Sequence, residues 1–375
     1  MKDKSNSASS ATAVSVSPPL VSTYSENELA ALADNIKRWG RELGFQQVGI
    51  TDTYPGEHSE HLRRWLNKNL HGEMTYMADR EALRRDPTVL HEKTLRIISL
   101  RMDYLPPNVE TIKLLDHPRT AYLSRYALGR DYHKLIRKRI KQLADTIIEH
   151  TGERSQRPFV DSAPVLERAF AEKAGLGWIG KNTMLINSSM GSWFFLGELF
   201  TDLPLPIDTP QTTKHCGSCT ACLDICPTKA FNGPFELDAR KCISYLTIEL
   251  KGSIPEPLRG LIGNRVFGCD DCQLICPWNK FAKPTDEKDF SPRHGLDNAS
   301  MVDLFLWTED EFEQKTQGSP IRRIGYERWL RNLAVGLGNG ENSSQAIAAL
   351  QGRLNQSPLL NEHIEWALQR LNPSV

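Results

Sequence analysis

The sequence predicts an α+β protein made of three successive parts: a region of mixed helices and strands, a cysteine-rich segment and a helical tail. Helical and strand patterns alternate through about residue 205, all eight cysteines lie between residues 216 and 276, and the last part shows helical spacing of apolar residues. The boundaries we predict are 1–25 for a disordered leader, 26–205 for the first domain, 206–282 for the cysteine domain and 283–375 for the tail.

The overall composition is that of an ordinary globular protein. Its 375 residues suffice for several domains, and Lys plus Arg balance Asp plus Glu at 46 each, so no general positive field attracts nucleic acid. No apolar run approaches the ~18 residues that span a bilayer. The Ser-rich leader has neither the apolar stretch of an export signal nor a twin-arginine pair. We therefore expect a cytoplasmic protein, in which clustered cysteines bind metal more often than they form disulfides.

The first domain shows both helical and strand periodicity. A helix is predicted over residues 28–43, where Leu29, Ile36 and Trp39 share one face, and Gly44 ends it. Further predicted elements are strands over 47–50, 95–104 and 193–200 and a helix over 132–150. Their alternation indicates an α/β or α+β domain.

The tail is predicted to be helical. A Pro-rich stretch over 203–210 separates the first domain from the cysteines, and a polar stretch over 280–297 precedes the tail. The tail carries apolar residues at helical spacing: Trp329, Leu333, Leu337, Ile347, Leu350, Leu354, Ile364 and Leu368. Two helices of this size resemble a truncated, HEAT-like solenoid repeat, although one unit is too short for a repeat array.

Four cysteines form a compact run, which is Cys216-x2-Cys219-x2-Cys222-x3-Cys226 followed by Pro227. This spacing is typical of bacterial ferredoxins with two clusters, in which the fourth cysteine binds the other cluster. Three thiolates on a tight loop can occupy three corners of one [4Fe–4S] cubane. The fourth, one helical turn later, points toward the second cubane.

The second half of the segment repeats this ending as Cys269-x2-Cys272-x3-Cys276-Pro277, and Cys242 supplies the missing ligand across a 26-residue insertion. We predict a ferredoxin-like domain that moves single electrons through two [4Fe–4S] clusters. The ligands of one cluster are Cys216, Cys219, Cys222 and Cys276, and those of the other are Cys226, Cys242, Cys269 and Cys272.

Two other uses of the cysteines fit less well. Zinc sites usually combine two C-x2-C pairs across a loop, which does not explain three cysteines at x2 spacing followed by x3 and proline. Disulfides are disfavoured by the expected compartment.

No motif identifies the redox centre that the clusters would supply with electrons. No predicted strand is followed by G-x-G-x-x-G, so a Rossmann nucleotide site is unsupported. The run from Asp131 to His133 resembles the start of the D-x-H-x-x-G cobalamin-base motif, but Ile136 replaces its glycine. We therefore expect His133 to be a polar residue that opens the following helix.

Besides the cysteine motifs, residues 159–185 contain several closely spaced residues that could form a site. Asp161 ends an apolar pair just before a predicted helix, where its simplest role is that of an N-cap. Gly175, Gly177 and Gly180 would let a flat ligand approach the backbone closely. From the residues alone, both a structural and a functional role remain open for Asp161.

In combination, four features resemble the epoxyqueuosine reductase family. They are the VD…ERAFAEKAGLGWIGKN segment over 160–185, the SRYALGRDYH run over 124–133, the IGNRVFGCD run over 262–270 and the split cysteine pattern. The resemblance covers residue 27 to the C-terminus. It implies a nitroreductase-like α/β cobalamin-binding domain, followed by the ferredoxin-like domain and the tail. It also implies an oxidoreductase that converts epoxyqueuosine to queuosine at the wobble position (34) of tRNA, the last step of queuosine biosynthesis.

The resemblance assigns roles to particular residues. Asp161 is implied to be the proton donor, kept protonated by an apolar, corrin-covered pocket that raises its pKa. Electrons are implied to pass through both clusters to cobalamin, which would lack an imidazole ligand from the incomplete motif. The implied cobalamin contacts are Arg84, Ser124, Asp161, Leu185, Leu196, Asp270 and Asp271.

A tRNA partner requires local basic contacts on a chain of zero net charge. The contacts we expect are Lys251, Arg265, Arg322 and Arg323, with Arg328 and Arg331 as further candidates. A basic group on the predicted helix over 132–150 fits an ordinary solvated helix face equally well, and consists of Lys134, Arg137, Lys138, Arg139 and Lys141. We expect a monomer that binds the anticodon arm, takes electrons from an external low-potential donor and has no membrane partner.

Two other functions remain open at this point. A reductive dehalogenase acting on a small molecule would share cobalamin and clusters, but such enzymes usually carry the twin-arginine signal that is absent here. A plain electron carrier would leave the first domain without a task.

Overall fold

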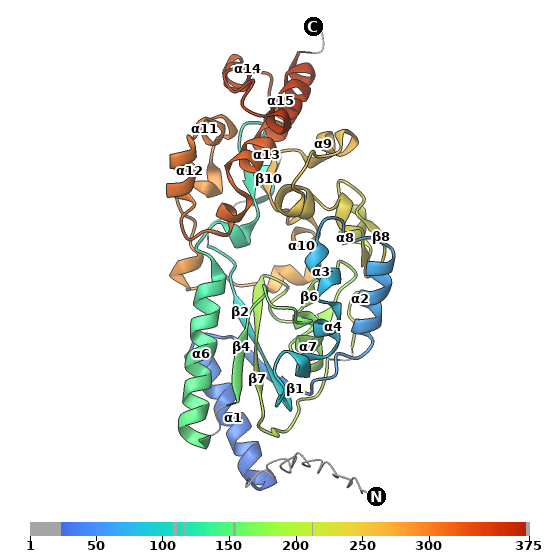
Figure 1. Ribbon diagram of the computed structural model, residues 1–375, viewed down its shortest axis with the longest axis vertical. Helices are drawn as coiled ribbons and strands as arrows, with labels where there is room; N and C mark the ends of the chain where they lie inside the picture. Colours follow the sequence, from blue (N-terminus) through green and yellow to red (C-terminus); the bar gives the residue numbers. More distant parts are fainter. Residues whose placement is uncertain (1–23, 108–110, 116, 153–154, 212, 373–375) are drawn as a thin grey trace, which may run out of the picture.

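The computed structural model describes residues 24–107, 111–115, 117–152, 155–211 and 213–372. Nearly all of the predicted leader lies outside these residues. Within them the first domain, the cysteine segment and the helical tail follow one another along the long axis of the molecule (Figure 1).

The first domain is built on a four-stranded antiparallel sheet. Its strands are β1 (Gln47–Thr51), β2 (Arg96–Asp103), β7 (Phe194–Thr201) and β4 (Gln156–Phe159), in the order β1-β2-β7-β4. The predicted strands over 47–50, 95–104 and 193–200 are confirmed, and the α+β class with them. The α/β description of this domain is wrong, because every strand pair in this sheet is antiparallel.

Alternate residues of the central strands face different helices. Ile98 and Leu199 pack with α1 (Glu26–Glu42) and α6 (Tyr132–Thr151), which confirms the two predicted helices. Ile97 and Phe200 pack with α7 (Glu167–Lys173) on the opposite face. The sheet is therefore covered on both sides (Figure 1). Three short helices lie between β1 and β2: α2 (His58–Asn67), α3 (Thr75–Asp79) and α4 (Glu81–Arg85).

The three glycines between α7 and the sheet allow close packing of protein on protein. They flank the hairpin of β5 (Trp178–Ile179) and β6 (Leu185–Ile186). A Cβ on Gly177 would lie 2.2 Å from the carbonyl oxygen of Ile186, and one on Gly180 would lie 2.4 Å from the Ile186 side chain. Gly175 has φ +76°. The prediction that these glycines accommodate a flat ligand is therefore wrong.

The cysteine segment joins the first domain through a parallel strand pair that the sequence did not reveal. After α8 (Ala221–Asp224), β8 (Phe231–Gly233), β9 (Glu236–Leu237), a π-helix (Tyr245–Glu249) and α9 (Glu256–Ile262), the short strand β10 (Arg265–Phe267) pairs with β3 (Tyr122–Leu123). The helix α10 (Asp271–Leu274) then lies against α8.

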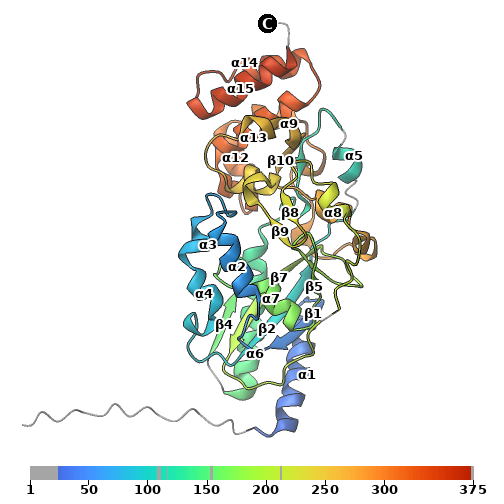
Figure 2. The same ribbon diagram turned by 90° about the vertical axis from the view of Figure 1, so that its right-hand side faces the viewer.

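The tail is helical, as predicted, and consists of α11 (Met301–Leu306), α12 (Glu309–Lys315), α13 (Tyr326–Asn339), α14 (Ser344–Gln351) and α15 (Pro358–Leu371). Its core is continuous with the other parts, because Trp329 and Leu333 belong to the same buried cluster as Leu123 and Phe267. Figure 2 shows the tail stacked directly on the cysteine segment. None of the helices in the described residues is both long and apolar enough to cross a bilayer.

Arg331 of α13 is wholly buried, so its prediction as a tRNA contact is wrong. Its guanidinium donates to the carbonyl oxygens of Leu246 (2.8 Å), Leu250 (2.8 Å) and Gly252 (2.6 Å). Burial lowers the pKa of Arg331 to about 10. This arginine therefore links the tail to the insertion of the cysteine segment.

Candidate active site

Asp161 lies on a strained turn between β4 and α7. Its φ of +41° falls in the left-handed region, which a residue with a Cβ rarely adopts. The backbone N–H of Asp161 donates to Oε1 of Glu167 at 2.6 Å, and this bond holds the turn. Leu166, not Asp161, is the N-cap of α7, so the simple capping role is excluded.

The carboxylate of Asp161 binds two side chains from the start of α6. The Tyr132 hydroxyl donates to Oδ2 at 2.5 Å, and Nε2 of His133 lies 3.2 Å from the same oxygen. Nδ1 of His133 lies 2.7 Å from Asp131, the N-cap of α6. Residues that looked like a helix start and an incomplete motif therefore form one site with Asp161, and sequence reasoning missed this role of Tyr132 and His133.

The hydrogen bonds of this site stabilise a charged imidazolium at His133 and an ionised carboxylate at Asp161. Burial raises the pKa of Asp161, but hydrogen bonds from His133 and Tyr132 outweigh burial, so the pKa lies below its ordinary value. Burial would lower the pKa of His133, but bonds to Asp131 and Asp161 raise it to about 9. The groups of this chain alone therefore lower the pKa of Asp161, because its polar neighbours stabilise the carboxylate more than burial destabilises it.

Two interacting carboxyl groups, the partly buried Glu167 and the buried Glu198, lie next to Asp161. Glu198 of β7 is wholly buried and accepts a hydrogen bond from Ser99 of β2 at 3.2 Å. Burial and the adjacent Glu167 raise its pKa well above the ordinary value, and burial and the charge of Asp161 raise the pKa of Glu167 to about 7. The pair therefore shares a proton. Sequence reasoning missed it, although an acidic residue inside the apolar strand FFLGELFT was a usable signal.

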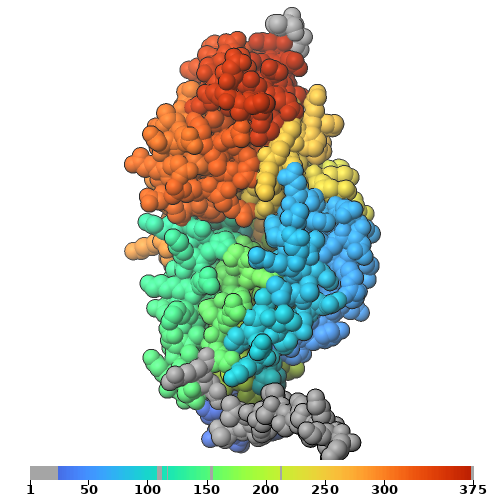
Figure 3. Space-filling view, viewed as in Figure 1, coloured from blue at the N-terminus to red at the C-terminus, as the bar shows by residue number. Residues whose placement is uncertain are grey.

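The side chain of Asp161 is half exposed, and groups of the first domain and the tail act on it beside a recess in the surface. Its side chain keeps 52% of its surface exposed, yet Arg323 of the tail lowers its pKa. Asp161 in turn raises the pKa values of Tyr76 in α3 and Tyr126 after β3, in both cases as a smaller cause than burial. In Figure 3 the surface is hollowed between the teal start of α6 and the cyan α3, with green parts of the chain inside the hollow.

Ser124, Asp270 and Asp271 are brought together beside this recess. Asp270 is buried and accepts hydrogen bonds from Ser124 Oγ (2.5 Å), the Tyr122 hydroxyl (2.6 Å) and the backbone N–H of Arg125 (2.8 Å). Its neighbour Asp271 pairs with Arg265 and accepts a hydrogen bond from the Cys269 thiol at 2.8 Å. The carboxylates of both aspartates are thus occupied by hydrogen bonds and an ion pair with other residues of this chain.

The other predicted cobalamin contacts lie in two places. Arg84 is buried and donates to the carbonyl oxygen of Tyr76 at 3.0 Å, so it orients a residue of the recess. Leu185 is buried in β6, and the partly buried Leu196 of β7 packs against the same apolar cluster under α7.

Most of the thiols that act on one another's pKa values belong to the same predicted set. Burial and the thiols of Cys276, Cys216 and Cys219 raise the pKa of Cys222 to about 11. In the second set the pKa of Cys272 is raised by burial and by Cys242, Asp270, Cys222 and Cys226. Within the described residues no three Cys, His, Asp or Glu side chains converge on a single metal ion.

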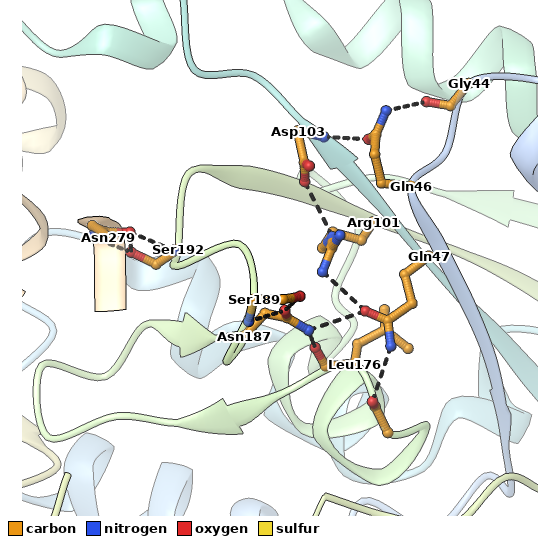
Figure 4. A network of polar contacts seen from close by, with 11 residues as sticks. Gly44, Gln46, Gln47, Arg101, Asp103, Leu176, Asn187, Ser189, Ser192 and Asn279 are labelled. Atoms are coloured by element: carbon orange, nitrogen blue, oxygen red, sulfur yellow. Dashed lines mark hydrogen bonds and ion pairs between the residues drawn. The ribbon is translucent and has the colours of Figure 1, made fainter. Parts of the chain in front are cut away.

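A polar network fixes the cysteine segment against the sheet (Figure 4). The side-chain oxygen of Gln47 in β1 accepts hydrogen bonds from Arg101 (3.0 Å) and from Asn187 (3.1 Å) in the loop before β7. Further along this loop, the backbone of Ser192 donates to Asn279 at 2.7 Å, three residues after the cluster ligand Cys276. The network therefore ties the position of one predicted cluster to the core of the first domain.

The predicted tRNA contacts differ in availability. Lys251 is exposed and lines an opening of about 680 Å³ beside α13. Arg322 pairs with Glu313 and Arg323 with Glu249, and both arginines remain about half exposed. Arg265 keeps only 11% of its side chain exposed, because two hydrogen bonds hold it on Asp271. The prediction of a tRNA contact at Arg265 is therefore not supported.

Comparison with known families gives two matches along the chain. Residues 84–162, which include Ser124, His133 and Asp161, match the family described as "Epoxyqueuosine reductase QueG, DUF1730". Residues 215–279 match the "4Fe-4S double cluster binding domain". The second match supports two clusters and argues against the zinc alternative.

Related proteins cover nearly the whole chain. The epoxyqueuosine reductase of Pseudomonas aeruginosa is 62% identical over 94% of this chain and 98% of its own length. That of Escherichia coli K12 is 55% identical over 91% and 90% of the two chains.

Solved structures show the same architecture. An epoxyqueuosine reductase crystallised with an epoxyqueuosine-modified tRNA-Tyr stem loop superimposes with a TM-score of 0.83, at 27% identity over 91% of this chain and 90% of that one. The Bacillus subtilis enzyme, with its catalytic aspartate loop swung out of the active site, gives 0.79 at the same identity and coverage.

Proposed function

Because the chain belongs to the epoxyqueuosine reductase family, we propose that it is the reductase that converts epoxyqueuosine to queuosine at position 34 of tRNA. The observation that carries this proposal is the 62% identity to a curated family member over 94% of the chain. The reaction takes up two electrons and two protons, opens the epoxide, forms a carbon–carbon double bond and releases water. The chain therefore needs an electron path and a proton source at one site.

The electron path consists of the two cysteine sets, each holding one [4Fe–4S] cluster. The set of Cys226, Cys242, Cys269 and Cys272 is nearer to the recess. The ring of Tyr126 lies 6.3 Å from that of Tyr132 in the site and 6.2 Å from that of Phe267, two residues before Cys269. Electrons therefore enter at the first set and leave from the second.

We infer that a cobalamin bound in the recess is the electron acceptor. The side chain of Asp161 is half exposed beside this recess. Both ring nitrogens of His133 are occupied by Asp131 and Asp161, so that imidazole is not available as a cobalt ligand. The residues that would hold the cobalamin are Ser124, Leu196, Tyr76, which Arg84 orients, and the backbone at Asp270 and Asp271. A bound cobalamin would supply low-potential electrons to the epoxide.

Asp161 and His133 act together as the proton source. His133 is a cation at neutral pH and shares its proton with Asp161, which lies beside the recess. Asp161 delivers this proton to the oxygen that leaves as water and is recharged by His133. Glu167 acts as a positioning residue, because its carboxylate holds the strained backbone of Asp161.

The substrate RNA would lie against Lys251, Arg322 and Arg323. These exposed cations lie on the insertion and the tail, and phosphate contacts of this kind make affinity fall steeply with salt. The tail would serve as a HEAT-like grip on the anticodon arm. We further propose a cytoplasmic monomer, because reduced thiols and tRNA occur together in that compartment. The dehalogenase alternative is not favoured, given the identity to epoxyqueuosine reductases.

The function is tested with anaerobically purified protein, supplied with cobalamin, a chemical reductant and tRNA from cells lacking the enzyme. We expect mass spectrometry of the nucleosides to show epoxyqueuosine replaced by queuosine. Epoxyqueuosine that persists with protein carrying both clusters would refute the proposal. An absorption spectrum of the desalted protein tests cobalamin binding separately from turnover.

A further inference from the structure

The first cysteine set lies at the protein surface. Cys219 is exposed, and the ammonium group of Lys181 donates to the carbonyl oxygens of Gly217 (2.7 Å) and Cys219 (2.9 Å) in the same loop. The loop is therefore held to the β5–β6 hairpin while its outer side faces solvent. An electron entering from outside would meet this set first.

Aromatic side chains surround this loop. The ring of His215 lies 4.7 Å from Trp178 and 5.5 Å from Trp278, and Trp278 lies 6.0 Å from Phe281. Phe281 is 44% exposed, and Phe235, on the turn between β8 and β9, is 47% exposed. Figure 2 shows α8 and the β8–β9 hairpin together on one side of the molecule. Large apolar side chains exposed in one area indicate a binding surface.

Lysines surround the aromatic side chains. Lys214 lies 5.5 Å from the ring centre of Phe235, and Lys280 lies 4.8 Å from that of Phe281. In the described part of the chain, no carboxylate forms an ion pair with Lys181, Lys214 or Lys280. We call the surface formed by these three lysines, Phe235 and Phe281 around Cys219 the cluster face.

We propose that the cluster face docks a small electron-carrier protein whose one-electron centre lies within an acidic surface. This inference rests on the proposed function, because a reductase must receive its electrons from a donor. An apolar centre with a charged edge suits a transient complex, and opposite charges speed the encounter. Each encounter oxidises the carrier by one electron and reduces the first cluster by one. Two encounters supply the two electrons that one epoxide consumes, and the two protons come from solvent through His133 and Asp161.

Lysines beside exposed aromatic rings can also bind RNA. Two observations favour the carrier. The cluster face surrounds a predicted cluster ligand, whereas the expected tRNA contacts Lys251 and Arg323 lie elsewhere, on the insertion and the tail. RNA binding at the cluster face is therefore the alternative that the experiment must separate.

The test compares Lys214→Glu/Lys280→Glu with a control of equal charge change, Arg85→Glu/Lys93→Glu, on exposed side chains of the first domain. Bleaching of cluster absorbance by reduced flavodoxin, an acidic one-electron flavoprotein, is followed by stopped flow at several salt concentrations. We expect the cluster-face variant to lose about 10- to 100-fold in second-order rate at low salt, and its salt dependence to flatten. The control should change less than twofold. The milder Lys214→Gln/Lys280→Gln should give an intermediate loss if the glutamate variant lacks its iron.

Two further measurements separate the outcomes. Photoreduced deazariboflavin, a small neutral reductant, should reduce all variants equally, and binding of an anticodon stem-loop RNA by fluorescence anisotropy should not change. The proposal is overturned if flavodoxin fails to reduce the unchanged protein, if the variants are reduced as fast as the control, or if they lose RNA affinity instead. If deazariboflavin reduces the clusters but epoxyqueuosine persists, the proposed function fails while the docking result stands.

Discussion

The Asp161 site and the cysteine segment differ in how they offset the free-energy cost of burying ionisable groups. Around Asp161 the protein supplies the compensation itself: Tyr132 and His133 bind the carboxylate, and the Glu167 side chain accepts from the Asp161 backbone N–H. In the cysteine segment, burial and neighbouring thiols raise the pKa values of Cys222 and Cys272, and little in the protein offsets this. The first region is organised before any cofactor binds, whereas the second requires its iron.

Because of this difference, mutations in the two regions should affect different properties of the protein. Changes in the Asp161 site should alter chemistry with little effect on folding, because the site is small, partly open and attached to a well-packed sheet. Changes in the cysteine sets should alter both, because iron binding and folding of the segment are coupled.

The largest effect is expected from Cys272→Ser. The second cluster should be lost, iron should fall from about eight to about four atoms per chain, and turnover should become undetectable. Thermal unfolding should shift downward as well. The control is Ser218→Ala, an exposed residue between two ligands. A Cys272→Ser protein with full iron would contradict both the ligand assignment and the contrast drawn above.

Asp161→Asn should lower turnover by about 10³-fold, because an amide cannot relay a proton to the leaving oxygen. Iron content, cobalamin absorbance and the unfolding temperature should remain unchanged, in contrast to the cysteine variant. Ser162→Ala tests whether any change in this exposed turn has the same effect. Near-normal turnover of Asp161→Asn would exclude the relay role.

His133→Gln should lower turnover by about 10²-fold, because the variant keeps a polar contact but has no cation to recharge Asp161. In the unchanged protein the pKa of His133 is raised to about 9, so activity should fall as the pH rises through about 9. That alkaline loss should be absent in the variant. A pH–rate profile of single turnovers measures both, and identical profiles would refute the assignment of the proton to His133.

Glu167→Gln should have the smallest effect on rate, about tenfold, because a carbonyl oxygen can still accept from the Asp161 N–H. Its clearer effect concerns stability. Because folding raises the pKa of Glu167 from 4.5 to about 7, the folded state binds this proton more tightly than the unfolded state. The resulting stability is complete below pH 4.5 and is lost as the pH rises through 7.

Unfolding temperatures of Glu167→Gln should therefore decline less between pH 5 and pH 8 than those of the unchanged protein. Glu309→Gln, at an exposed position of α12, is the matched control. Equal declines in all three proteins would show that the carboxyl pair does not hold a shared proton.

Helices and strands with a strong periodicity of apolar residues were predictable from the sequence. Pairs of short strands from distant segments were not. The apolar steps of α1 and α6 are local signals, and so is the cysteine spacing. The β3–β10 pair joins two or three residues from segments more than 140 positions apart, so no local pattern marks it. Arg331 looked like a surface cation because its helix is amphipathic, and only the carbonyl oxygens of the insertion explain its burial.

The candidate site was predictable only in part for the same reason. Asp161 came from a family resemblance, whereas its partners lie about 30 residues away along the chain and reach it through the packing of α6 against the sheet. The direction of its pKa shift depends on distances of about 3 Å or less, which a sequence does not contain.

The shared core of the tail and the cysteine segment affects how genetic data should be interpreted. A premature stop codon before α11 would remove Trp329 and Leu333 and leave Leu123 and Phe267 uncovered. Cells with such an allele would lack queuosine because the truncated product is degraded. That phenotype alone would therefore not establish the tail as a tRNA-recognition module; point substitutions on its outer face are required.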